Sequence, residues 1–92
     1  MKIKVKLLKP FSDIAGKGMV DIEFEEENVE QALLELCRLY PDLKKELFNE
    51  QGEVTFSVNI FVNDKPISAL EDVNTRLDEG DEILIFMPVG GG

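Results

Sequence analysis

The chain has 92 residues, 43% of them hydrophobic, which is typical of one domain built around one core. It carries 19 acidic and 10 basic residues, for a net charge of −9. This balance argues against binding to nucleic acid or to an anionic membrane surface, because phosphate groups need clustered cations. With no histidine and one cysteine, the usual general base and an internal disulfide are excluded. Without a signal peptide or a long apolar run, we expect a cytoplasmic protein.

Two strands are predicted at the start of the chain. Polar and apolar residues alternate strictly over 2–7, with Ile3, Val5 and Leu7 inward. Residues 13–18 contain two glycines and are predicted to form a hairpin loop. Alternation resumes over 20–25, which predicts a second strand antiparallel to the first.

A helix is predicted next. Asn28 can cap its N-terminus, with Gln31 at the reciprocal capping position. Pro41 ends this helix because it lacks an N–H group, and a second short helical turn is expected over 42–48. The apolar residues that follow at helical spacing are Val29, Ala32, Leu33, Leu36, Cys37 and Tyr40. Cys37 on this stripe is predicted to be a small core residue.

The second half of the chain adds the remaining strands. A strand is predicted over 56–62, then a turn over 63–66 and a short edge segment near Ile67. Residues 69–81 are expected to be irregular. The last strand, over 82–87, is apolar at five consecutive positions, which is typical of a central strand. One helix on one face of a small mixed sheet is an α+β fold, with the last strand beside the first.

Alternation also predicts a surface on the sheet face away from the helix. The residues expected to face the helix are Ile3, Val5, Leu7, Phe56, Val58, Ile60, Val62, Ile83 and Ile85. In that case Phe61, Leu84 and Phe86 point outward, on the face shared by Lys4 and Lys6. An exposed aromatic cluster usually marks a partner site, so we predict a partner-binding surface formed by Phe61, Leu84, Phe86, Met87, Lys4 and Lys6. The alternative is that the three apolar residues are covered by loops or singly exposed.

The chain ends in Pro88, Val89, Gly90, Gly91 and Gly92. Glycine has no Cβ, so such a tail can pass through a narrow channel and present its carboxylate to another enzyme. The sequence therefore predicts a domain over 1–87 and a flexible tail over 88–92, with Gly91 and Gly92 as the reactive end. A merely frayed terminus is the alternative.

Four segments resemble the sulfur-carrier family of β-grasp, ubiquitin-like proteins, which includes MoaD-like and ThiS-like carriers. The segments are Leu8–Gly16, Val62–Ile67, Leu77–Ile83, and Ile85–Val89 with the glycines after it. Met87 stands where the family usually has the first of two prolines, and three glycines stand where two are common. The length is most similar to that of the small subunit of molybdopterin synthase.

The resemblance implies a β-grasp sheet of four to five strands with one main helix, and a sulfur-carrier function. An adenylyltransferase of ubiquitin-activating type, which consumes ATP, would adenylylate Gly92. A sulfur donor protein would convert it to a thiocarboxylate. The large subunit of molybdopterin synthase would then receive the sulfur for molybdenum or tungsten cofactor synthesis. No bound cofactor, no metal site and no catalytic group of the chain's own are expected.

Two other functions stay open at this point. A ubiquitin-like modifier would be joined through Gly92 to lysines of other proteins, and such proteins can also carry sulfur for tRNA thiolation. A non-covalent interaction domain with an inert tail would bind partners through the sheet face alone.

Overall fold

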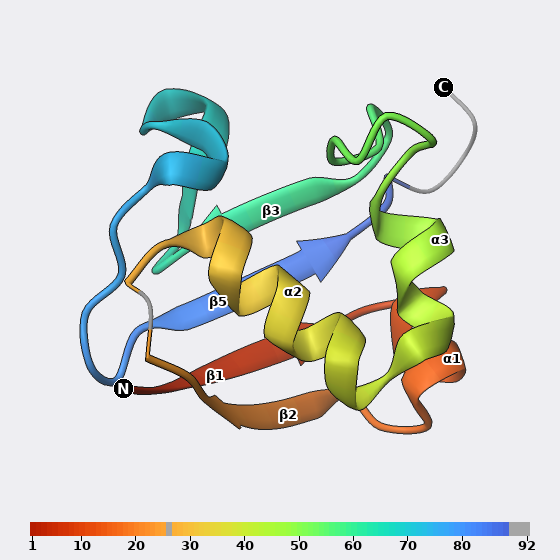
Figure 1. Ribbon diagram of the computed structural model, residues 1–92, viewed down its shortest axis with the longest axis horizontal. Helices are drawn as coiled ribbons and strands as arrows, with labels where there is room; N and C mark the ends of the chain where they lie inside the picture. The colour runs from red at the N-terminus through yellow and green to blue at the C-terminus, as the bar shows by residue number, and fades with distance from the viewer. Residues whose placement is uncertain (26, 89–92) are drawn as a thin grey trace.

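A five-stranded mixed sheet with one long helix across one face forms the domain (Figure 1). The fold is given by a computed structural model, which describes residues 1–25 and 27–88. The strands are β1 (Lys2–Leu7), β2 (Met19–Glu23), β3 (Asn59–Val62), β4 (Lys65–Pro66) and β5 (Glu82–Phe86). The predicted β-grasp architecture is confirmed, and the sheet, predicted to have four to five strands, has five.

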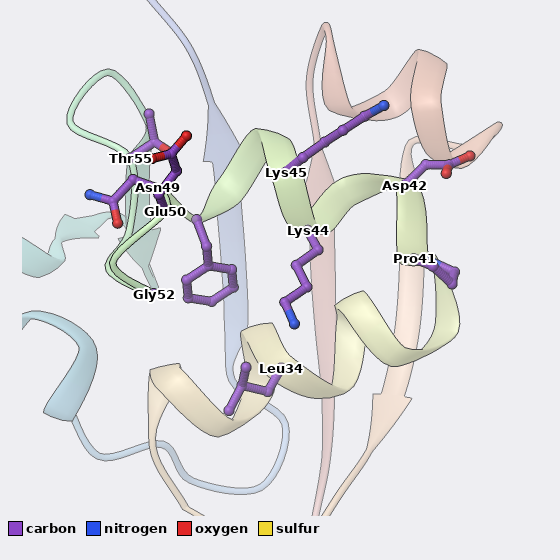
Figure 2. A pocket seen from close by; sticks show the side chains of 10 residues that line it. Leu34, Pro41, Asp42, Lys44, Lys45, Asn49, Glu50, Gly52 and Thr55 are labelled. Atoms are coloured by element: carbon purple, nitrogen blue, oxygen red, sulfur yellow. The ribbon is translucent and has the colours of Figure 1, made fainter.

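The helical elements are short apart from α2. They are α1 (Phe11–Ala15), α2 (Val29–Leu39) and α3 (Lys44–Leu47), with 3-10 turns at Pro41–Leu43, Ile67–Ala69 and Asp72–Asn74. The Oδ1 atom of Asn28 accepts a hydrogen bond from the Gln31 N–H at 2.9 Å, so the predicted N-cap of α2 is confirmed. Figure 2 shows α3 beside α2, with the Lys44 side chain pointing toward Leu34.

The order of strands across the sheet is β2-β1-β5-β3-β4. The last strand, β5, runs parallel to β1 and antiparallel to β3, as predicted for a central strand. Its inward residues Ile83 and Ile85 are fully buried. The strand that leads to the C-terminal tail is therefore held by hydrogen-bonded neighbours on both sides.

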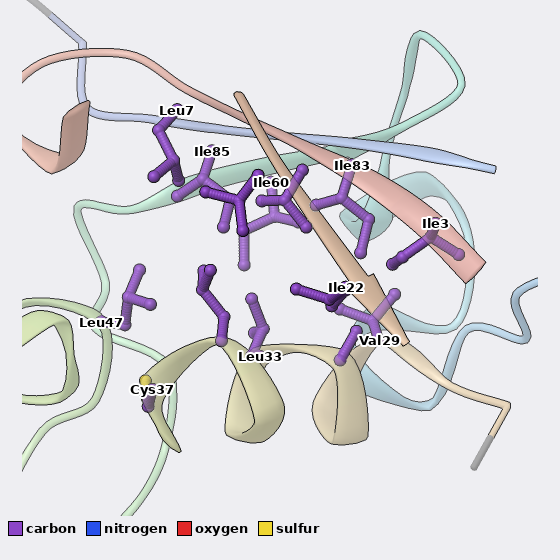
Figure 3. Packing of buried hydrophobic residues seen from close by; sticks show 14 of the residues in the cluster. Ile3, Leu7, Ile22, Val29, Leu33, Cys37, Leu47, Ile60, Ile83 and Ile85 are labelled. Carbon is purple, nitrogen blue, oxygen red and sulfur yellow. The ribbon is translucent and has the colours of Figure 1, made fainter. Parts of the chain in front are cut away.

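The core lies between the sheet and α2 (Figure 3). Leu33 and Val29 of α2 point from the helix toward Ile60, Ile83 and Ile85 of the sheet. Burial of each such side chain contributes about 1.5–3 kcal/mol to folding, so this layer is the main source of stability. Cys37 is buried at the same face, as predicted.

The structure corrects the predicted hairpin loop over 13–18. The chain instead forms α1, which begins at the fully buried Phe11 and ends at Ala15, with Gly16 as its C-cap at a φ of +80°. Burial of Phe11 fixes this helix, and five residues are too few for a helical period to be recognised.

The structure also corrects the third strand, which begins at Asn59 rather than at residue 56. Thr55 donates its N–H to Leu47 at 2.8 Å, and the Val58 N–H closes a turn on Thr55 at 3.0 Å. Phe56, predicted to face the helix, therefore lies outside the sheet and is fully exposed, while Val58 is only half-buried.

Smaller shifts occur at other element boundaries. β2 spans Met19–Glu23 rather than 20–25, and β5 ends at Phe86, one residue before the predicted end. The predicted helical turn over 42–48 is a 3-10 turn followed by α3. The edge segment is β4, one residue before Ile67, and short 3-10 turns occupy parts of 69–81.

Candidate functional site

Three apolar residues gather on the sheet face away from α2, and we call Phe61, Leu84 and Phe86 the outer patch. Phe61 lies opposite Leu84 in the pairing of β3 with β5. The rings of Phe61 and Phe86 are 5.7 Å apart between centroids and tilted by 41°, a spacing that favours aromatic contact. All three side chains are half-buried rather than covered. The structure thus brings together the apolar residues predicted for the partner surface.

The two predicted lysines occupy different rows of the sheet. Lys6 lies opposite Leu84 in the β1–β5 pairing, so it flanks the outer patch directly. Lys4 lies opposite Glu82 on one side and Asp21 on the other, so it belongs to a charged row. Both lysines are exposed. Lys6 is therefore the cation beside the apolar surface.

Met87 differs from the other predicted surface residues. It follows Ile83 and Ile85 at alternate positions and packs partly against the core. Pro88 comes next and is exposed. Val89, Gly90, Gly91 and Gly92, which were assigned to the tail and its reactive end, lie outside the described residues.

Sequence reasoning missed three apolar residues around the outer patch. Leu8 continues the outward alternation of β1 and is 42% exposed, and Met19 lies opposite Lys6 and is 41% exposed. Pro66 lies opposite Phe61 on β4. Alternation of β1 could have identified Leu8, whereas Met19 and Pro66 depend on strand registers that the sequence does not specify.

A network of polar hydrogen bonds holds the start of β5, at the end of the strand away from Phe86. Asn63 donates its side-chain N–H to Asp81 Oδ1 at 2.8 Å, and its Oδ1 accepts the Glu82 N–H at 3.0 Å. Asp81 Oδ2 also accepts the Asp78 N–H at 2.8 Å. Asn63 and Asp64 both have positive φ, as the two-residue turn between β3 and β4 requires. These contacts hold the β3–β4 hairpin against the start of β5.

Cys37, the one cysteine of the chain, was predicted to be a small core residue. Burial raises the pKa of its thiol to about 11, and the opposing effect of the Lys44 ammonium is smaller. At neutral pH the thiol is protonated and shielded, and a buried thiol of this kind is inert. Cys37 is therefore a core residue.

An open groove of about 900 Å³ lies on the helical side of the molecule, between α2, α3 and the loop after α3 (Figure 2). Leu34 and Phe48 supply its apolar surface, and its rim carries both signs of charge. Thr55 is a hydroxyl in its lining, but the chain contains no histidine to activate it.

Within residues 1–25 and 27–88, no three histidine, cysteine or acidic side chains are grouped closely enough to hold a metal ion. None of the helices in that part of the chain has the length and apolarity needed to cross a bilayer.

Comparison with known proteins places the chain in a family. The model of the ThiS family matches residues 5–92. Small archaeal modifier protein 3 of Haloferax volcanii is 29% identical over the full length of both chains. The "Putative sulfur carrier protein" of Archaeoglobus fulgidus is 30% identical, again over 100% of both chains.

Solved structures agree with this placement. The solution structure of small archaeal modifier protein 1 from Methanosarcina acetivorans is 36% identical, with a TM-score of 0.86 over 99% of this chain and 96% of that one. The "Putative molybdopterin converting factor, subunit 1" from Pyrococcus furiosus is 29% identical, with a TM-score of 0.77 over 97% of this chain and 99% of that one. The chain belongs to the ThiS family, in the ubiquitin-like group of sulfur carriers and small archaeal modifiers.

Proposed function

We propose that this protein is a sulfur carrier that acts as the small subunit of a molybdopterin synthase. The observation that carries the proposal is the position of β5, which is the central strand, carries Leu84 and Phe86 and ends shortly before the C-terminal residues in the chain. A reactive terminus needs a rigid base, because each mobile residue that becomes ordered on docking costs about 1–2 kcal/mol.

The proposed chemistry takes place at Gly92. In the active site of an adenylyltransferase of ubiquitin-activating type, the carboxylate oxygen attacks the α-phosphorus of ATP. An acyl adenylate forms and pyrophosphate is released. The terminal sulfur of a persulfide on the donor then attacks the acyl carbon, and AMP leaves. A thiol of the donor next cleaves the S–S bond of the acyl disulfide, so that the thiocarboxylate is released and a disulfide remains on the donor. The large synthase subunit receives this sulfur. ATP is consumed by the activating partner, and the carrier holds no cofactor of its own.

The outer patch supplies the affinity in this proposal. The chain from Met87 to the terminus reaches at most about 20 Å, so the folded domain must dock close to the partner's active site. Phe61, Leu84 and Phe86, with Lys6 beside them, form an apolar surface with a cationic flank at the base of the tail. Gly90, Gly91 and Gly92 offer no side chains to obstruct a narrow channel.

The test is to incubate the full chain with its cognate adenylyltransferase, ATP and a sulfur donor. Intact-mass spectrometry should show the gain produced when one oxygen is replaced by sulfur. A chain without Gly91 and Gly92 should show no gain. If the wild-type chain also shows none with an activator that forms the adenylate, the carrier proposal is wrong.

The outer patch is tested in the same assay. Phe86→Ala should raise the KM for adenylylation about tenfold, the effect expected when an aromatic anchor is lost from an interface. Leu39→Ala is the matched control, because Leu39 is 43% exposed on α2, on the other side of the sheet. An equal effect of both substitutions would remove the outer patch from the docking surface.

A protein modifier is the second candidate, and the identities to small archaeal modifier proteins favour it directly. The lysine amine of a target protein would then attack the acyl carbon of the Gly92 adenylate, forming an amide bond and releasing AMP. Sulfur carriage for tRNA thiolation is compatible with the same terminus. Because Arg76 is the last trypsin site, conjugated lysines would carry residues 77–92 after digestion. Such remnants in cells would support modification. Their absence, together with thiocarboxylate formation, would favour the carrier function alone.

A further inference from the structure

The two edges of the sheet differ in how they are protected. On one side β4 is only two residues long, Lys65–Pro66, and a 3-10 turn follows it at once. A short edge strand with lysine and proline is a common protection against further strand pairing. On the other side β2 has five residues, Met19–Glu23, without proline, glycine or lysine. We call the side of β2 that faces away from β1 the β2 edge.

Unpaired backbone groups line the β2 edge. Gly18 accepts the Leu7 N–H at 2.9 Å, and Phe24 donates its N–H to Met1 at 3.1 Å. Hydrogen-bonded pairs alternate along an antiparallel ladder, so the N–H and C=O groups of Met19, Asp21 and Glu23 point away from β1. No hydrogen bond to these groups is formed elsewhere within residues 1–25 and 27–88.

A groove continues from this edge toward α2. It has a volume of about 540 Å³ and is lined by Glu23, Phe24, Leu34 and Arg38, among others. Leu34 is 42% exposed there, although it lies on the main helix of the domain. A strand added to β2 would place alternate side chains over this groove and the others on the outer face of the sheet.

The charge at the edge is acidic. Asp21, Glu23 and Glu25 are exposed along it. Arg38 is held by Glu35 at 2.6 Å, so its charge is balanced within the groove. Lys2 and Lys4 on β1 lie opposite Glu23 and Asp21 in register, but no ion pair joins them. The edge therefore favours cationic side chains on an approaching chain.

We propose that the β2 edge binds an extended basic segment of a partner protein, which adds to the sheet as a sixth strand. The apolar side chains of that segment cover Leu34 and Phe24 in the groove. Its basic side chains lie on the outer face beside Asp21 and Glu23. The main-chain hydrogen bonds come from Met19, Asp21 and Glu23. This interaction does not depend on the proposed carrier function, because β1 separates the β2 edge from β5 and the outer patch.

The test uses a synthetic peptide of alternating lysine and valine, about as long as β2, with the full chain labelled with ¹⁵N. Binding should slow hydrogen exchange of the Met19, Asp21 and Glu23 amides at least about tenfold, because they become hydrogen-bonded. Exchange of Val20 and Ile22, which already face β1, should not change. A peptide with the same sequence and charge but alternate N-methyl groups should bind at least about tenfold more weakly.

Charge is tested separately. The double variant Asp21→Asn/Glu23→Gln should weaken peptide binding and reduce its salt dependence. The variant Asp13→Asn/Glu50→Gln has the same net charge and alters exposed acids away from the edge, so it should bind normally. Three results would overturn the proposal: equal binding of the N-methylated peptide, contacts centred on Phe61 and Phe86, or self-pairing of β2 edges that slows exchange without peptide.

Discussion

At the scale of single residues, the positions that support the site are those at turns and in the core. Asn63 adopts a φ of +48° and bonds both to Asp81 and to Glu82. Asparagine tolerates this left-handed conformation better than most residues. The backbone of Asn63 thus forms part of the β3–β4 turn, and its side chain positions the beginning of β5.

We expect Asn63→Ala to lower the free energy of unfolding by about 1–2 kcal/mol, because it removes two hydrogen bonds and places a Cβ residue at positive φ without local polar contacts. Asn63→Gly removes the same bonds but relieves the backbone, so it should be less destabilising. Urea unfolding monitored by circular dichroism measures both. Equal stability of wild type and Asn63→Ala would contradict the assigned role.

Cys37 gives a prediction about alkaline pH. Burial raises its pKa to about 11 in the folded chain, whereas an unfolded cysteine titrates near 8.5. Between these values the unfolded state loses its proton first, so the free energy of unfolding should fall as pH rises from about 9 to about 11. Unfolding curves should show a steeper decline for wild type than for Cys37→Ala. Parallel declines would mean that the thiol is not protected in the folded chain.

At the scale of elements, the sequence predicted those with a clear period. The alternation of β1 and the helical stripe of α2 identified both elements, and the N-cap placed the start of α2 at the observed residue. The outer patch followed from alternation in β3 and β5. Alternation did not predict α1, because burial of Phe11 in the core determines it. It also misplaced the start of β3, which the hydrogen bonds of Thr55 determine. Met19 and Pro66 were missed because their places beside the outer patch depend on strand register, which the hydrophobic period alone does not determine.

The N-cap of α2 provides a test at this scale. Asn28→Ala should lower the free energy of unfolding by about 1 kcal/mol, since the Gln31 N–H loses its acceptor. Asn28→Asp keeps an acceptor and should remain close to wild type. Thermal unfolding of the three chains distinguishes these outcomes, and loss of stability in Asn28→Asp alone would point to charge repulsion with nearby glutamates instead of capping.

At the scale of the whole molecule, net charge limits the available partners. The chain has a net charge of −9, and its lysine and arginine residues are spread over several elements. Such a field repels other polyanions and attracts basic proteins. The acidic β2 edge and the outer patch beside Lys6 thus offer different chemistry on two parts of one sheet.

The charge predicts a negative result that is simple to measure. The chain should not shift duplex DNA or single-stranded RNA in a gel at low salt, and should not sediment with phosphatidylserine vesicles, because its net charge is −9 and acidic residues lie opposite Lys2 and Lys4 on β1. A basic protein of similar size serves as the positive control. Binding that weakens with added salt would show a cationic surface that the fold does not indicate.

The parallel pairing of β1 with β5 has a mechanical consequence. The first strand begins at one end of the sheet and the last strand ends at the other. A force that pulls the two ends of the chain apart therefore slides β1 along β5 and loads their hydrogen bonds together, instead of opening them one after another. The domain should therefore resist mechanical unfolding when another protein binds its C-terminus and pulls on it.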